Sequence, residues 1–290
     1  MKKVKSNYIA VLCSLSMILY TSCSNPTKDH STEANTTSLS DSSRIDSLSA
    51  DKKQLIDFKF STAVINLPSP FEVVNDLFVY KAPFKSELLN PSTNSEKYLV
   101  SFKKEINFGI LGVDLSYINF YNQNQETVAY FNAVQGIAKD LNIENVFNEF
   151  ADRYKSNADN HDSLVAIVDN IFNQTDAYLK KNDRYLVASN VMAGAIIEVN
   201  YLSLNLIKDM PKTPENAKLF EKVYNENGGI FHLISLYEEY TDKDSKALLA
   251  SMKEYKKGYE GIISAANDLT PEKIEKAVVM IDKLRGNLIK

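Results

Sequence analysis

The chain has no tryptophan, and only three histidines and two cysteines among its 290 residues. Both cysteines, Cys13 and Cys23, lie near the N-terminus, so the rest of the chain can form neither an internal disulfide nor a cysteine-based zinc site. Known motifs are also missing: there is no G-x-S-x-G, H-E-x-x-H, P-loop or G-x-G-x-x-G. The sequence therefore predicts no metal, no cofactor and no catalytic residue of a known type.

Basic charge is in short supply as well. The formal net charge is -4, and cleavage before Cys23 would remove three lysines and leave 30 basic against 37 acidic side chains. Phosphate binding needs a basic face, so nucleic acid is excluded as an expected partner. The same balance argues against adhesion to anionic lipid by charge alone. An acidic surface mainly keeps a domain soluble.

The first 22 residues have the organisation of a signal peptide. Three lysines, Lys2, Lys3 and Lys5, precede an uncharged, mostly apolar stretch from Tyr8 to Tyr20. This stretch is too short to span a bilayer, which needs about 20 residues, but it fits the core of an export signal. We expect residues 1–22 to be a signal peptide.

The segment Leu19-Tyr20-Thr21-Ser22-Cys23 resembles the lipobox of bacterial lipoproteins. It departs from the usual pattern at Tyr20, where that family most often has leucine. The resemblance implies cleavage before Cys23, lipid on its thiol and an acylated amino group. Several acyl chains hold far better than one, because each buried CH₂ contributes about 0.8 kcal/mol. An export signal cleaved without lipid and an uncleaved anchor are the open alternatives.

Residues 23–50 follow as the lipidated cysteine and a tether rich in serine and threonine, without aromatic residues. Such a segment buries too little apolar area to offset its ordering entropy, so we expect a flexible linker with an r.m.s. span of roughly 30 Å. The composition changes near Lys52, and residues 51–290 are expected to form one helical domain. Within it, Phe58 and Phe60 alternate with Lys59, which suggests an extended segment over 57–67.

Helical periodicity dominates from Ser69-Pro70 onward. The predicted helices cover about 70–81, 95–121, 125–141, 144–156, 162–181, 184–208, 214–226, 229–240, 243–266 and 271–288. Thr213-Pro214 and Thr270-Pro271 are typical helix starts, and Asn227-Gly228-Gly229 indicates a stop and restart. The fold class is all-α: an irregular bundle of about nine or ten helices.

Two segments, Ile106–Tyr121 and Tyr185–Ile207, are apolar nearly all round, so both are expected to be central helices. Glycines inside them indicate close helix approach or a local kink. The second is long enough to span a membrane, but its polar residues, among them Asn190 and Glu198, would be costly in lipid. We therefore place it in the core.

Each central helix carries one charge, Asp114 in the first and Glu198 in the second. A carboxylate in an apolar helix must be paired, hydrogen-bonded or protonated. Tyr117 and Tyr201 lie three residues further on, and other partners must come from another helix. We favour a buried polar network that fixes helix register. The functional alternative is a pocket in which these four residues bind a small polar or cationic ligand, or an acid-only active site.

The body also resembles the uncharacterised helical lipoproteins of the Bacteroidota, through LPSP at 67–70, NFGILGVDLSYINFY at 107–121 and AGAIIEVNYL at 193–202. That resemblance implies no activity. We expect a cell-envelope lipoprotein held to a membrane by Cys23, with a non-enzymatic binding or structural role and an envelope protein or small polar ligand as partner. We favour the periplasmic face of the outer membrane over the inner membrane.

Overall fold

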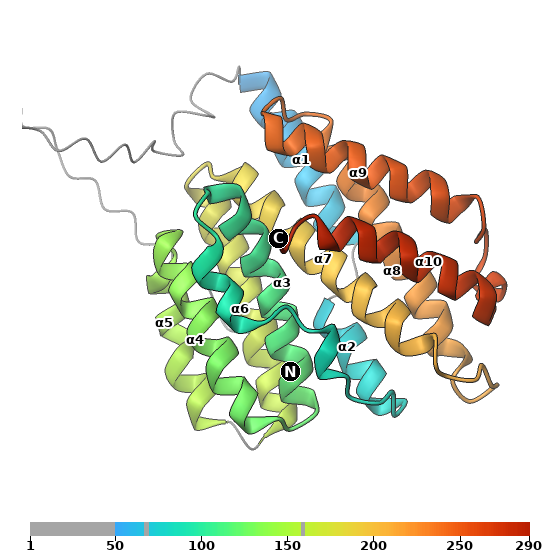
Figure 1. The fold of residues 1–290 in the computed structure, drawn as a ribbon. Helices are drawn as coiled ribbons and strands as arrows, with labels where there is room; N and C mark the ends of the chain where they lie inside the picture. Colours follow the sequence, from blue (N-terminus) through green and yellow to red (C-terminus); the bar gives the residue numbers. More distant parts are fainter. Residues whose placement is uncertain (1–49, 67–69, 158–159) are drawn as a thin grey trace, which may run out of the picture. The chain divides into compact units, whose positions relative to one another are not determined.

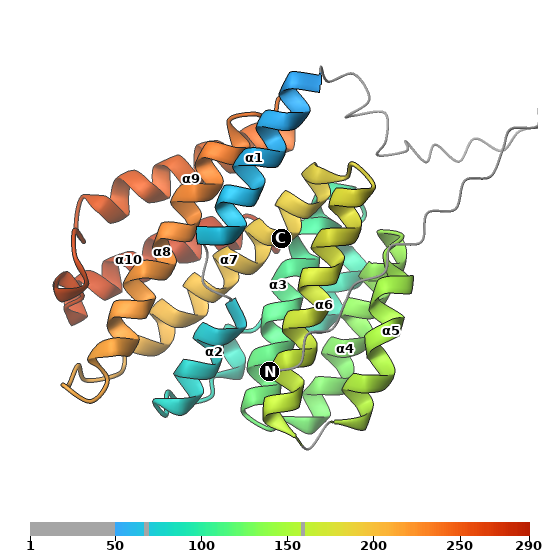
Figure 2. The same cartoon turned by 180° about the vertical axis from the view of Figure 1, so that it is seen from behind.

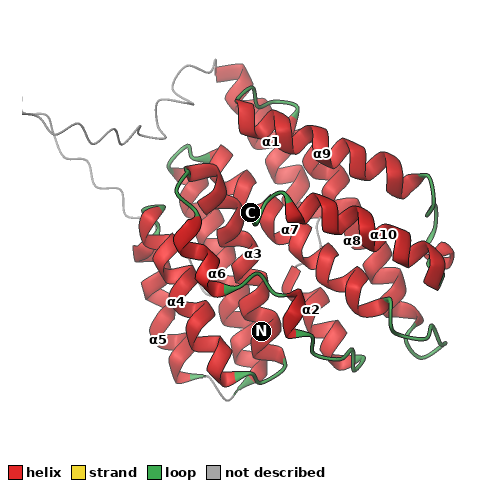
Figure 3. Cartoon of the chain, viewed as in Figure 1, coloured by secondary structure: helices red, strands yellow, loops and turns green. Residues whose placement is uncertain are grey.

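The structure is a computed structural model that describes residues 50–66, 70–157 and 160–290. In these ranges it contains α-helices, short 3₁₀ helices and no strand, which confirms the all-α class (Figures 1 and 3). The α-helices are α1 Ala50–Asn66, α2 Pro70–Val79, α3 Ser101–Phe120, α4 Asn124–Asp140, α5 Glu144–Ser156, α6 His161–Lys181, α7 Tyr185–Ile207, α8 Ala217–Tyr237, α9 Lys243–Glu260 and α10 Pro271–Gly286. The predicted signal peptide, Cys23 and the tether up to residue 49 lie outside the described residues.

Helices α3 and α7 are the two central helices, as predicted from the apolar segments Ile106–Tyr121 and Tyr185–Ile207. Every residue from Glu105 to Ile118 of α3 is buried, and so is every residue from Leu186 to Ile207 of α7 except Met192. These two helices pack against each other more extensively than any other pair. A helix that is apolar on all sides is stable in water only when other helices surround it.

Two glycines allow this close packing. A Cβ atom on Gly109 would lie 2.0 Å from the carbonyl oxygen of Val191, and one on Gly194 would lie 2.0 Å from the carbonyl oxygen of Ile106. Each glycine therefore faces the backbone of the other helix at the crossing point. This confirms the expectation of close helix approach at these two positions.

The other helices lie on two sides of this central pair. Helices α4, α5 and α6 lie on one side, and α1, α8, α9 and α10 on the other (Figures 1 and 2). Helices α3 to α7 follow one another with short connections, three of which contain a left-handed residue, at Asn122, Asn142 and Asp183. A left-handed residue at a helix end allows an immediate reversal of the chain. The starts of α3, α5 and α7 and the ends of α4 and α6 consequently share one end of the bundle.

The expectation of an extended segment over 57–67 is wrong. Residues up to Asn66 belong to α1, in which the buried side chains Ile56, Phe60 and Ala63 recur at helical spacing. The alternation of Phe58 and Phe60 was misleading because only Phe60 enters the core, whereas Phe58 is 69% exposed.

Three helix boundaries also differ from the prediction. The helix expected over 95–121 is interrupted between the 3₁₀ helix η3, Ser92–Lys97, and the start of α3. Helix α8 continues through Asn227-Gly228-Gly229, where no glycine has positive φ and the side chain of Asn227 bonds to the carbonyl of Val223 at 3.1 Å. Helix α9 ends at Glu260, ahead of the short 3₁₀ helix η4, Ala266–Asp268.

Of the two helix starts predicted at Thr-Pro, the structure confirms one. Thr270 caps α10 by accepting from the backbone N–H of Lys273, and Asn160 caps α6 in the same way from Ser163. Near Thr213, however, the helix begins later, at Ala217, after a turn in which the side chain of Asn216 bonds to the backbone of Thr213.

Helix α7 is the one described helix that is long and apolar enough to cross a membrane. Within the most apolar window of α7, 94% of the residues are buried inside the protein. Its apolar character is thus that of a core helix.

Candidate functional site

Asp114 on α3 and Glu198 on α7 are both fully buried, with side chains in the interior between their helices. The central helices are otherwise uncharged along this stretch, and each buried carboxyl group must find polar partners inside the protein. The two acids obtain these partners in different ways.

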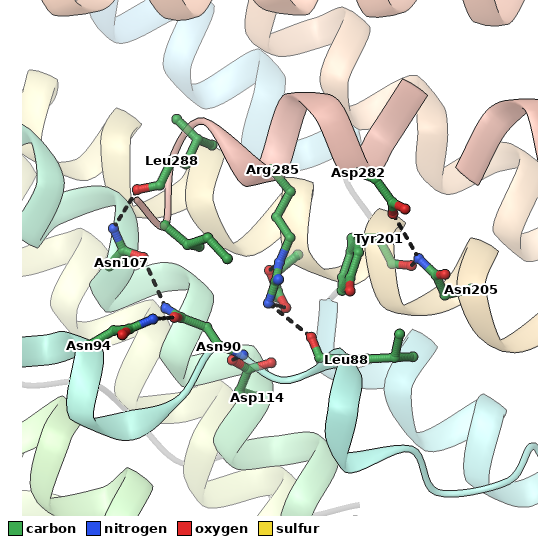
Figure 4. Close-up of polar contacts among 12 residues, drawn as sticks. Leu88, Asn90, Asn94, Asn107, Asp114, Tyr201, Asn205, Asp282, Arg285 and Leu288 are labelled. Carbon is green, nitrogen blue, oxygen red and sulfur yellow. Dashed lines mark hydrogen bonds and ion pairs between the residues drawn. The ribbon is translucent and has the colours of Figure 1, made fainter. Parts of the chain in front are cut away.

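Glu198 forms an ion pair with Arg285, which α10 contributes from the C-terminal end of the chain. The Arg285 Nε lies 2.7 Å from Glu198 Oε2 and the second guanidinium nitrogen lies 2.8 Å from Oε1, so the pair is bidentate. The guanidinium also donates to the carbonyl oxygen of Leu88 at 3.0 Å and lies 4.1 Å from the ring centre of Tyr201 (Figure 4). The buried Arg285 thus has its charge paired, three hydrogen bonds made and one face covered by an aromatic ring.

The electrostatics of Arg285 follow from this geometry. Burial by itself lowers the pKa of a guanidinium, but the charge and hydrogen bonds of Glu198 outweigh burial and raise the pKa of Arg285. The charge of Asp114 raises it further. Arg285 is therefore a permanent cation at the centre of the protein.

Asp114 is the third ionisable member of the group. Burial raises the pKa of Asp114 well above its usual range, and the charge of Glu198 raises it further against the opposing effect of Arg285, so the neutral form is favoured. Its Oδ2 accepts from the backbone N–H of Asn90 at 3.0 Å, and its Oδ1 has no hydrogen-bond partner among the described residues. The charged part of this group is therefore the Arg285–Glu198 pair.

The structure brings Asp114, Glu198 and Tyr201 together around Arg285, but it directs Tyr117 elsewhere. The hydroxyl of Tyr117 accepts from the backbone N–H of Lys85 at 2.8 Å, and its ring stacks on Phe84 with 5.2 Å between centres. Burial raises the pKa of the phenol of Tyr117, and likewise that of Tyr201, to about 12, so both remain neutral. The four residues proposed as one site therefore belong to two neighbouring sets of contacts.

Asparagines extend the polar group toward the C-terminus. The side chain of Asn90 donates to Asn107 at 3.1 Å and to the hydroxyl of Tyr98 at 3.0 Å. Asn107 in turn donates to the carbonyl oxygen of Leu288 at 3.1 Å (Figure 4). The loop before α3, helix α3 and the last residues of the chain are thereby joined by consecutive hydrogen bonds.

Arg285 is the functional-site residue that sequence reasoning missed. It lies on the same face of its helix as the buried Ile274, Val278 and Ile281. An arginine on the apolar face of an amphipathic helix is a signal of a buried ion pair, because the cost of burying it requires an acidic partner. That signal was readable in the sequence, although its partner was not.

A second buried polar group links α3, α7 and α8. The hydroxyl of Tyr237 donates to Asn190 at 2.5 Å, and the amide of Asn190 donates to Glu105 at 2.5 Å. Burial raises the pKa of Tyr237 well above its usual range. Like the first group, this one connects helices distant in sequence through the interior.

Glu226 on α8 is a fourth buried acid, after Asp114, Glu198 and Glu105. It is fully buried, and neither carboxylate oxygen has a hydrogen-bond partner among the described residues. Burial raises the pKa of Glu226 to about 8, against the lowering effect of Lys222 one turn earlier. Lys222 itself is engaged by Glu72, at 2.7 Å, and Asp76 of α2.

The remaining histidine and tyrosine side chains of the late part of the chain form no further site. His232 is exposed. Four tyrosines are buried: Tyr237, Tyr240, Tyr255 and Tyr259. In the ranges that the structure describes, no three His, Cys, Asp or Glu residues cluster in a way that could hold a metal ion.

The fold and this interior therefore define an all-α protein whose polar centre is an Arg–Glu pair beside a neutral aspartic acid. Comparisons with protein-family models, curated proteins and solved structures give no match.

Proposed function

We propose that the protein is a lipid-anchored protein of the bacterial cell envelope with a non-enzymatic binding or structural role. The anchor is lipid on Cys23, supported by the basic start, the short apolar stretch and the lipobox-like Thr21-Ser22-Cys23. The helical body would be held at the membrane by residues 24–49. We favour the periplasmic face of the outer membrane as its location.

One observation carries the non-enzymatic role: Glu198 is already held by Arg285 in a bidentate pair that is 0% exposed on the acid side and 7% on the arginine side. An acid-only active site requires carboxyl groups that can reach a substrate. Here the pair instead joins α7, α10 and the residues around Leu88. A ligand or partner would then be bound at the surface, and Asp114, Glu198 and Tyr201 would serve stability.

The anchor is tested by metabolic labelling with palmitate in the native host. We expect label on the wild-type chain and on Cys13→Ser, and none on Cys23→Ser, because only Cys23 occupies the lipobox position. Cys13→Ser is the matched control, since it changes the chain's other thiol within the same leader. Label that persists in Cys23→Ser, or is absent from the wild type, contradicts the proposal.

A further inference from the structure

Two apolar residues are displayed at the start of α3. Leu99 is 84% exposed and Val100 is 58% exposed, although they follow the buried Tyr98 directly. Leaving leucine and valine side chains in water costs free energy, and nothing within the described residues covers these two. An adjacent pair at the edge of a helix start is better placed for contact with another surface than scattered single residues.

The first half of α1 has a second exposed apolar pair. Leu55 is 42% exposed and Phe58 is 69% exposed, and they lie three residues apart on the face of α1 opposite the buried Ile56 and Phe60. On a helix, residues three apart are neighbours. Together they form a short apolar stripe on the first helix after the predicted tether.

Ion pairs and hydrogen bonds place both pairs at one end of the bundle. Lys104 at the start of α3 pairs with Asp140 at the end of α4, at 2.5 Å. The turn after α4 is joined to the turn after α6 by Arg184, which donates to the carbonyl oxygen of Leu141 at 2.8 Å.

The turn after α6 is joined to the first turn of α1 by Lys53, 3.5 Å from Asp183. Figures 1 and 2 show the starts of α1 and α3 toward the same end of the helices. We call this end, with Leu55, Phe58, Leu99 and Val100, the α1 end.

The charges at the α1 end are compatible with a lipid surface. Four acidic groups there are paired with lysines: Asp140 and Asp183 as above, Glu239 with Lys59 at 2.5 Å, and Glu238 with Lys253 at 2.8 Å. These four carboxylates therefore add no unpaired negative charge to the α1 end. Lysine side chains around apolar residues can also extend to the headgroups while the apolar groups enter the interface.

We propose that the α1 end rests on the lipid bilayer, with Leu55, Phe58, Leu99 and Val100 entering its interfacial region. The inference rests on the proposed anchor at Cys23, which precedes Ala50 by 27 residues. A linker of that length spans roughly 30 Å, so the anchor keeps the α1 end at a high effective concentration next to the bilayer. Weak apolar contacts are then sufficient to orient the domain.

The opposite end of the bundle, near the turn between α3 and α4, also has exposed apolar side chains. They are Phe78, Val79 and Val128, which are 37%, 58% and 61% exposed. The chain from Cys23, however, enters at the start of α1. The two ends therefore give opposite orientations on the membrane, of which the anchor favours one.

The absence of tryptophan supplies a direct test. The lipidated full-length protein is purified as Leu99→Trp and, separately, as Val128→Trp, each of which contains a single tryptophan. Both are reconstituted on vesicles of phosphatidylethanolamine and phosphatidylglycerol with brominated acyl chains, which quench only tryptophan within the bilayer. Both replaced positions are exposed, so the far-ultraviolet circular dichroism should match that of the wild type, and flotation verifies attachment to vesicles.

We expect the tryptophan at position 99 to lose most of its fluorescence on brominated vesicles, relative to unbrominated ones, and to emit at shorter wavelength. The tryptophan at position 128 should be unaffected. Equal quenching at both positions, quenching at 128 alone, or no quenching on vesicles that float with the protein would overturn the inference and leave the anchor intact. Failure of the wild type to float at all would instead overturn the anchor.

Discussion

At the scale of single residues, the interior of this protein contains a group of three buried ionisable side chains, Asp114, Glu198 and Arg285. Arg285 and Glu198 form an ion pair, whereas the neutral form is favoured for Asp114 because its pKa is raised. Burial is the larger cause of that rise, and the neighbouring charge of Glu198 is the second. The two acids therefore have different roles despite their similar appearance in the sequence.

This difference predicts unequal effects of two isosteric changes. Glu198→Gln removes the only charge paired with Arg285 in the bidentate contact and should lower the free energy of unfolding by roughly 3–5 kcal/mol, the usual cost of breaking a buried pair. Asp114→Asn preserves the donor and acceptor of the protonated acid and should change it by less than about 1 kcal/mol. Urea unfolding at neutral pH measures both.

The double variant Glu198→Gln with Arg285→Met is the control for that experiment. It removes both charges, so it should lose less free energy of unfolding than the sum of the losses measured for Glu198→Gln and Arg285→Met separately. Equal destabilisation by Asp114→Asn and Glu198→Gln would contradict the assignment of Asp114 as the neutral acid.

Glu226 predicts a pH dependence of stability. The native protein retains a proton on Glu226 up to a pKa of about 8, whereas the unfolded chain releases it near 4.5. The contribution of this group to the free energy of unfolding therefore falls as pH rises from 4.5 to 8 and is level above and below that window. Glu226→Gln, which cannot ionise, should flatten the curve and stabilise the protein above pH 8 by roughly 2–5 kcal/mol.

The measurement is a series of urea titrations of wild type and Glu226→Gln across this window. Glu221→Gln on the same helix is the matched control, because Glu221 is exposed. A wild-type curve parallel to that of Glu226→Gln throughout would show that Glu226 has an ordinary pKa in the native state.

At the scale of helices, the crossing of α3 and α7 depends on the absence of side chains at two positions. Gly109→Ala or Gly194→Ala would place a methyl group 2.0 Å from a backbone carbonyl oxygen of the other helix, so the helices must separate. Overpacking of this kind costs at least about 1–3 kcal/mol, and the rigid backbone neighbour favours the upper part of that range.

Gly136→Ala is the matched control for the crossing. Gly136 lies inside α4, and a Cβ there meets nothing within 4 Å. Because alanine favours a helix over glycine by up to about 1 kcal/mol, this change should stabilise the protein. Thermal unfolding followed by circular dichroism should therefore shift in opposite directions for Gly136→Ala and Gly109→Ala, and shifts of the same sign would refute the role of the crossing.

At the scale of the whole molecule, the residues after α10 pack against the start of α3. Leu288 is 5% exposed, and its carbonyl oxygen accepts from Lys103 at 3.1 Å as well as from Asn107. The chain end thus contacts the beginning of α3, and Arg285 just before it contacts Glu198. The final residues are part of the core although they lie beyond the last helix.

Removal of residues 287–290 should therefore lower the free energy of unfolding by roughly 2–5 kcal/mol, through loss of the buried leucine and of the acceptors for Lys103 and Asn107. Removal of the exposed Lys290 alone should change it by less than about 0.5 kcal/mol. Denaturant unfolding compares the two truncations, and equal stabilities would show that the chain end contributes nothing.

The helical class and the identity of the two central helices can be read from the amino-acid sequence. Both follow from local properties: side-chain periodicity, helix capping at Thr270, and the near absence of charge along residues 106–120 and along α7. The sequence also indicates that Asp114 and Glu198 need partners, because a charge in an apolar helix is costly wherever the helix lies.

The identity of these partners follows from the packing of the helices. Arg285 is 87 residues from Glu198 along the chain, and Tyr117 turns to Lys85 rather than to Asp114. Packing also explains why α1 is helical and why α8 continues through Gly228, because the helix propensity of phenylalanine and glycine is low. Pairing across a chain depends on how helices pack, and no periodicity within one helix specifies the residue that another helix brings to it.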